Sequence, residues 1–131
     1  MDVMGIGLFK LASSRLSYLA TRHQTIAENV SNASTPGFVS RDLKPFEAAL
    51  KEAEVRLART QPGHMGLGSA AEDGRFGVDS DAPVWEVTPS GNSVVLEQEM
   101  LKASETVASY SLVSNLYKSS HSMLKLAISS Q

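Results

Sequence analysis

The chain has 131 residues, of which 42% are hydrophobic, 20% charged and 6% aromatic, and this length is typical of one domain. Its formal net charge of −2 excludes the basic surface that a nucleic-acid-binding domain needs. The absence of cysteine excludes disulfides and thiolate zinc sites. No apolar stretch is long enough for a transmembrane helix. The N-terminal residues also lack the basic start of a cleaved secretory signal.

Residues 1–35 are predicted to form a long helix with a narrow apolar side. Positions from 9 to 33, alternately three and four residues apart, are apolar except for His23. This spacing is typical of the seam of a coiled coil. The residues that we expect to form this seam are Leu16, Leu19, Ile26 and Val30.

The first helix is expected to end before Pro36, because proline disfavours helical geometry in the residue that precedes it. Thr35-Pro36-Gly37 is a favourable turn sequence, in which the glycine accepts a positive φ. Residues 36–60 are then expected to hold this turn and a short helix with Pro45 in its first turn. Residues 61–93 are rich in glycine and net acidic, which predicts a long loop with one short strand near residues 84–88.

Residues 94–131 are predicted to form a second long helix, with Asn92 or Ser93 as its N-terminal cap. The apolar positions of this helix follow the same spacing, and its seam comprises Leu96, Met100, Val107, Tyr110, Leu124 and Ile128. The predicted fold class is therefore mainly α. Two long N- and C-terminal helices pack as a coiled-coil hairpin, joined by a short helix and a Gly/Pro-rich loop with little β structure.

The sequence predicts no catalytic, cofactor-binding or metal site. His23, His64 and His121 are too far apart to form an H-x-x-x-H pair, and no glycine-rich stretch ends in the Gly-Lys-Ser/Thr of a phosphate loop. The aspartates at 79 and 81 do not continue into the pattern of an EF-hand. The first helix has too few basic residues for strong attraction to anionic lipid, so we expect no direct lipid binding.

The segment from Ala27 to Phe38 reads Ala-Glu-Asn-Val-Ser-Asn-Ala-Ser-Thr-Pro-Gly-Phe. From the residues alone, it is a polar helix end followed by a tight turn. It also resembles the N-terminal signature of the bacterial flagellar rod and hook family, Ala-x-Asn-x-x-Asn-x-x-Thr-Pro-Gly-Phe/Tyr. Two more segments, 57–64 and 91–100, resemble the B-type proximal rod members of that family. The residues that the resemblance marks as an assembly motif are Asn29, Asn32, Thr35, Pro36, Gly37 and Phe38.

The resemblance implies a non-enzymatic structural subunit of the proximal rod of the flagellar basal body, which transmits torque and forms the wall of the export channel. It implies several partners: other copies of the chain, other flagellar rod proteins, the rod–ring adaptor, and components of the membrane ring and export gate. It also implies a periplasmic location in the basal body, reached by type III export without a cleaved signal peptide.

A soluble helical adaptor or export chaperone, acting as a binding module, is the alternative from another class. The glycine- and proline-rich segment 61–93 disfavours this alternative, because small chaperones tend to be helical throughout.

Overall fold

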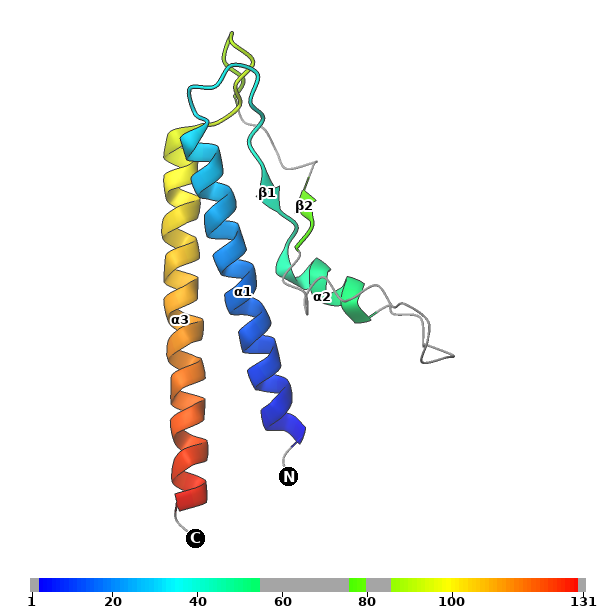
Figure 1. Ribbon diagram of the computed structural model, residues 1–131, viewed down its shortest axis with the longest axis vertical. Helices are drawn as coiled ribbons and strands as arrows, with labels where there is room; N and C mark the ends of the chain where they lie inside the picture. The colour runs from blue at the N-terminus through cyan, green and yellow to red at the C-terminus, as the bar shows by residue number, and fades with distance from the viewer. Residues whose placement is uncertain (1–2, 55–75, 80–85, 130–131) are drawn as a thin grey trace.

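The computed structural model describes residues 3–54, 76–79 and 86–129. Two long antiparallel helices lie side by side, so that the start of the first and the end of the second are at the same end of the molecule (Figure 1). A two-stranded sheet and a short helix lie on one side of the first helix. This arrangement confirms the predicted fold class. In chain order, the elements are α1 (Val3–Ser31), β1 (Asp42–Leu43), α2 (Phe46–Glu54), β2 (Val78–Asp79) and α3 (Leu96–Ser129).

The turn after α1 forms as its sequence predicts. The backbone N–H of Phe38 donates to the carbonyl oxygen of Thr35 at 3.3 Å, and Gly37 between them has a φ of 72°. An L-residue with a side chain rarely adopts this conformation, so the glycine is required by the geometry of the turn. The turn sends the chain back along α1 toward β1.

A small hydrophobic core forms where β1 and α2 cover α1. Tyr18 lies at its centre, with its ring 5.4 Å from that of Phe46 and 5.2 Å from that of Phe76. Its hydroxyl donates to the carbonyl oxygen of Lys44 at 3.1 Å, which satisfies the one polar group that the ring brings into the core. The buried members of this core are Tyr18, Leu19, Leu43, Phe46, Ala49 and Phe76.

The start of α2 differs by one residue from the prediction. Pro45 immediately precedes the helix, and its carbonyl oxygen accepts hydrogen bonds from the backbone N–H groups of Ala48 and Ala49. Phe46 is therefore the first helical residue. Proline suits this position because its missing N–H is not needed for the helix.

The predicted strand near residues 84–88 is wrong within the part of the chain that is described. Residues 84 and 85 lie outside the described residues, and residues 86–88 are not in a strand. The strand that does form is β2, which pairs antiparallel with β1, with Leu43 opposite Val78. The neighbouring Phe76 is buried in the core and so brings this segment alongside β1. Such a tertiary contact leaves no alternating pattern in the sequence.

The face of α1 that is buried is rotated from the predicted seam. Ala12, Leu19 and Ile26 are buried, which agrees with the prediction for Leu19 and Ile26. A second row, Arg15, Arg22 and Asn29, also turns inward, with Asn29 buried and the two arginines half-buried, whereas His23 and Val30 of the predicted row are exposed and Leu16 is half-buried. Both rows have heptad spacing, and polar contacts described below explain why the charged row faces inward.

On α3 the same rotation occurs. The residues that face α1 include Glu99 and Thr106, both buried, and Val113, which packs against the core. Within one chain, the predicted seam residues of α3 are instead exposed to solvent, as is Val30 of α1. The exposed members of the predicted seam are Val30, Leu96, Met100, Val107, Tyr110, Leu124 and Ile128.

Candidate functional site

The two segments that resemble the rod signatures, 27–38 and 91–100, meet at one end of the helix pair. The backbone N–H of Gly37 donates to the carbonyl oxygen of Ser90, and that of Ser93 donates to the carbonyl oxygen of Phe38, both at 3.0 Å. A Cβ at Gly91 would be 3.4 Å from the Cα of Gly37. We call this contact region, formed by residues 29–42 and 88–102, the junction.

Asn92 caps the end of α1 from the far side of the junction. Its Nδ2 donates to the carbonyl oxygens of Asn32 at 2.9 Å and Thr35 at 2.7 Å. Its Oδ1 accepts from the backbone N–H of Val94 at 2.8 Å. Because the last carbonyl groups of a helix lack partners within the helix, this buried amide supplies hydrogen bonds that the C-terminal end of α1 needs.

The predicted role of Asn92 or Ser93 as the cap of α3 is therefore wrong. The backbone N–H groups of Gln98 and Glu99, in the first turn of α3, donate to the carbonyl oxygen of Val95, so Val95 is the residue that precedes the helix. Ser93 is used elsewhere, since its Oγ accepts from the backbone N–H of Ser40 at 2.8 Å. Both polar side chains join the two segments instead of beginning the second helix.

Asn29 connects three separate parts of the chain. Its Nδ2 donates to the carbonyl oxygen of Arg41 at 2.7 Å and to Oε2 of Glu99 at 2.9 Å. Its Oδ1 accepts from the backbone N–H of Arg41 at 3.0 Å. The side chain is only 1% exposed, so these bonds form away from water, where an unmade bond costs most.

Glu99 continues this network into a row of charges. Its Oε1 accepts from Nζ of Lys102 at 2.9 Å, and the same Nζ lies 3.7 Å from Oδ2 of Asp42. Asp42 in turn receives two hydrogen bonds from the guanidinium of Arg22, each 3.0 Å long. The bidentate geometry is the strongest form of this ion pair. The row joins α1, β1 and α3.

The row perturbs the pKa values of two of its members. Burial alone would raise the pKa of Asp42, but hydrogen bonds from Arg22 and from the backbone N–H of Leu43 outweigh it and lower that pKa below 3.8. The hydrogen bond to Asp42 also raises the pKa of Arg22. Both side chains are therefore held in their charged forms. Their role is electrostatic contact between elements.

The remaining residues of the predicted assembly motif lie at the outer surface of the junction. The Nδ2 of Asn32 donates to the carbonyl oxygen of Glu28 at 2.9 Å, and its Oδ1 accepts from the hydroxyl of Thr35 at 3.2 Å. Pro36 is exposed and Phe38 is half-buried. The structure therefore brings the whole motif together, with Asn29 inside and the others around the turn.

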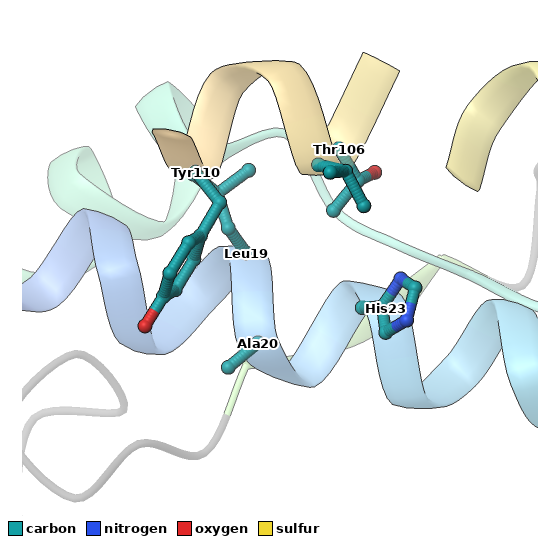
Figure 2. Close-up of a pocket in the computed structure, with 6 residues that line it drawn as sticks. Leu19, Ala20, His23, Thr106 and Tyr110 are labelled. Atoms are coloured by element: carbon teal, nitrogen blue, oxygen red, sulfur yellow. The ribbon is translucent and has the colours of Figure 1, made fainter. Parts of the chain in front are cut away.

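A shallow apolar groove runs between α1 and α3, with a volume of about 300 Å³. Figure 2 shows the Tyr110 side chain of α3 and the His23 side chain of α1 on its two walls. Val107 of the predicted seam also lines it. Leu16, one helical turn before Leu19 and Ala20 on α1, is half-buried. The groove places part of the predicted seam at the helix–helix boundary, but open to solvent.

Among the residues that the structure describes, no group of His, Asp or Glu side chains could hold a metal ion. His23 and His121 lie on different helices and are exposed, while His64, like the whole segment 57–64, is outside the described residues. Within the described ranges, no helix is long and apolar enough to cross a membrane.

Sequence reasoning missed four residues of the site. The four are Glu99, Arg22, Asp42 and Lys102, and charged side chains are mostly exposed in proteins, so nothing local in the sequence marks them as members of this network. The one available signal is that Arg22 lies seven residues before Asn29. That spacing places both on one row of α1.

Comparison with known proteins places the chain in a family. Residues 9–38 match the family described as flagella basal body rod protein. The chain is 38% identical to the flagellar basal body rod protein FlgB of Agrobacterium fabrum over 128 residues, which cover 94% of this chain and 93% of the relative. It is 32% identical to FlgB of Aeromonas hydrophila over 99 residues, 70% of this chain and 69% of that protein. The chain thus belongs to the FlgB family of flagellar basal body rod proteins.

Proposed function

We propose that this chain forms part of the proximal rod, where α1 and α3 contribute to the wall of the export channel and transmit torque. Membership of the FlgB family makes the chain a structural subunit of the basal body rod, not an enzyme. Such a subunit assembles with copies of itself and with other rod components. The proposal adds which surface makes those contacts.

The exposed apolar side chains of α3 carry the proposal. Met100 is 70% exposed, Val107 52% and Ile128 77%. A monomeric soluble protein rarely leaves so long an apolar row uncovered, and such rows mark surfaces that another protein covers. Since the row is already part of the predicted seam, we propose that it packs against helices of neighbouring subunits.

The junction supports the second part of the proposal. Hydrogen bonds and ion pairs connect α1, β1 and α3 at one end of the helix pair. A subunit that transmits torque must not let its two helices slide past each other, and this network resists such sliding. In the proposal, the motif from Asn29 to Phe38 therefore acts within the subunit, while the apolar seam acts between subunits.

The proposed neighbours are copies of this chain, other rod proteins, the rod–ring adaptor, the membrane ring and the export gate. The proposed location is the periplasmic part of the basal body, reached through type III export without a cleaved signal peptide. What supports these proposals is the rod name of the relatives. The alternative of a soluble adaptor or chaperone gains no support from those names.

A charge placed in the exposed seam tests the proposed function. Met100→Asp should leave the isolated chain folded, because the side chain is exposed there, yet it should abolish motility by placing a charge between subunits. Asn115→Asp is the matched control, since Asn115 is exposed on the same helix and its position on the helix turns away from the seam. The readouts are motility of a complemented strain, the amount of secreted chain and recovery of basal bodies. Equal motility of both variants would contradict the proposed contact.

A further inference from the structure

The face that α3 turns toward α1 is not its most apolar face. Glu99 and Thr106 are buried there beside the half-buried Val113, while most of the apolar side chains of α3 lie on two other rows. One is the exposed seam described above. The other comprises Leu101, Leu112, Leu116 and Met123, all exposed. If burial of apolar area alone decided the contact, Leu19 and Ile26 of α1 would pack against one of these rows.

We infer that the Asn29–Glu99 pair selects the face of α3 that α1 occupies and fixes the register, meaning the alignment of α1 residues along α3. Glu99 is 2% exposed and places one carboxylate oxygen on Asn29 and the other on Lys102. Glu99 is the side chain of α3 on which the structure places the Asn29 amide. The pair is a specificity determinant for the helix contact, beyond any role in the rod.

The cost of a wrong register follows from the neighbours of the pair. A slip of α1 by one helical turn would move Glu99 away from Asn29 and toward the position of Ile26 or Ala33. The buried carboxylate would then lose its amide partner in an apolar setting, which is strongly unfavourable. Only one alignment satisfies the pair.

The same pair also favours an α1 from its own chain. Asn29 is bonded through both atoms of its amide to the backbone of Arg41, and Asn92 holds the end of α1 from the segment that leads into α3. These bonds orient the Asn29 amide toward Glu99 of the same chain. The preference for α1 of the same chain matters because the apolar rows of α3 could otherwise pair with α1 of another copy. A buried polar residue in a coiled coil is known to specify register at a cost in stability.

The test uses the absence of cysteine from the chain, which allows cross-linking without background. Phe9 contacts Tyr117, with ring centroids 5.1 Å apart, so the pair Phe9→Cys and Tyr117→Cys reports the observed register with a short bismaleimide. The pair Phe9→Cys and His121→Cys reports a slip of one turn. Mixed isotope-labelled and unlabelled full-length chains distinguish links within a chain from links between chains.

With the Asn29–Glu99 pair intact, the 9–117 link should dominate at least tenfold over the 9–121 link and over links between chains. Glu99→Leu should bring the 9–121 link to within threefold of the 9–117 link and produce links between chains. Glu99→Gln, which keeps an acceptor for Asn29, should restore the native ratio. The control is Thr106→Val, because Thr106 is equally buried but bonds only the Lys102 carbonyl of its own helix. It should leave the ratio unchanged.

A native ratio in Glu99→Leu would overturn the inference, as would an altered ratio in Thr106→Val. If Glu99→Leu loses its helical circular dichroism, Asn29→Ala removes the other half of the pair. The 9–121 link is then expected in Asn29→Ala, and its absence overturns the inference. The measurement uses the isolated chain in solution, so its outcome does not depend on the proposed place of the chain in the rod.

Discussion

Asn92 binds the carbonyl oxygen of Asn32, sixty residues earlier in the chain, at 2.9 Å. The same amide binds the carbonyl oxygen of Thr35 and thereby closes the C-terminal end of α1. The end of one long helix is thus completed by the segment that begins the other. The two segments of the sequence that resemble the rod signatures are in this sense one structural unit.

Removing this side chain should weaken the whole helix pair. Asn92→Ala eliminates three hydrogen bonds of a buried group, and we expect a loss of about 2–3 kcal/mol in the free energy of unfolding. Asn115→Ala, at an exposed position of α3, should change it by less than about 0.5 kcal/mol. Urea unfolding monitored by circular dichroism measures both. Similar midpoints for the two variants would refute the capping role.

Glycine substitutions should rank in an order set by backbone geometry. Gly37→Ala forces a side chain into a positive φ in open space and should cost about 1 kcal/mol. Gly91→Ala also forces a side chain into a positive φ, of 81°, and brings its Cβ to 3.4 Å from the Cα of Gly37, so it should cost at least as much. Gly7→Ala, in the second turn of α1 with no atom near the new Cβ, should instead stabilise by about 0.5–1 kcal/mol. Thermal unfolding of the three variants checks the order, which a stabilising Gly91→Ala would contradict.

The Arg22–Asp42 pair predicts a pH dependence with a defined sign. The pKa of Asp42 is lower in the folded chain than its ordinary value of 3.8. Its contribution to stability is therefore complete above about pH 4 and is lost as the pH falls through the folded-state value. The stability difference between the unsubstituted chain and Asp42→Asn should be largest at neutral pH and shrink in acid. Denaturant unfolding between pH 2 and 7 measures it, and a difference that does not change with pH would count against the ion pair.

A charge introduced in the buried row of α1, which comprises Ala12, Leu19 and Ile26, should destabilise the fold far more than a charge at an exposed position of the same helix. Leu19 is 2% exposed, so Leu19→Asp should exceed the cost of about 2–5 kcal/mol typical of a leucine-to-alanine change. Ser13→Asp is the control, because Ser13 is exposed on the same helix. A charged side chain of α1 such as Arg22 would not serve as the control position, because a carboxylate introduced at residue 22 would lie next to Asp42 and repel it. Circular dichroism of the purified chains should show helix loss in Leu19→Asp alone, and intact helix in that variant would refute the assigned core.

The sequence predicts the two helices and the Pro36-Gly37 turn because these depend on local spacing and on backbone geometry. The phase of the helix contact could not be predicted, because the rows through Leu16 and through Arg15 have the same heptad spacing. The expectation that apolar residues are buried selects the row through Leu16. In the structure, however, Arg22 and Asn29 face inward because they form hydrogen bonds with Asp42 and Glu99. Glu99 lies 70 residues from Asn29, and no local pattern encodes so distant a partner.

The central claim is that the exposed seam of α3 becomes buried between subunits of the rod. The most direct test is the rate at which a maleimide labels Met100→Cys in this cysteine-free chain, first as the isolated protein and then in purified basal bodies. The isolated chain should label rapidly, because Met100 is 70% exposed. The account predicts at least a tenfold slower rate in basal bodies, and an equal rate in the two states would contradict it.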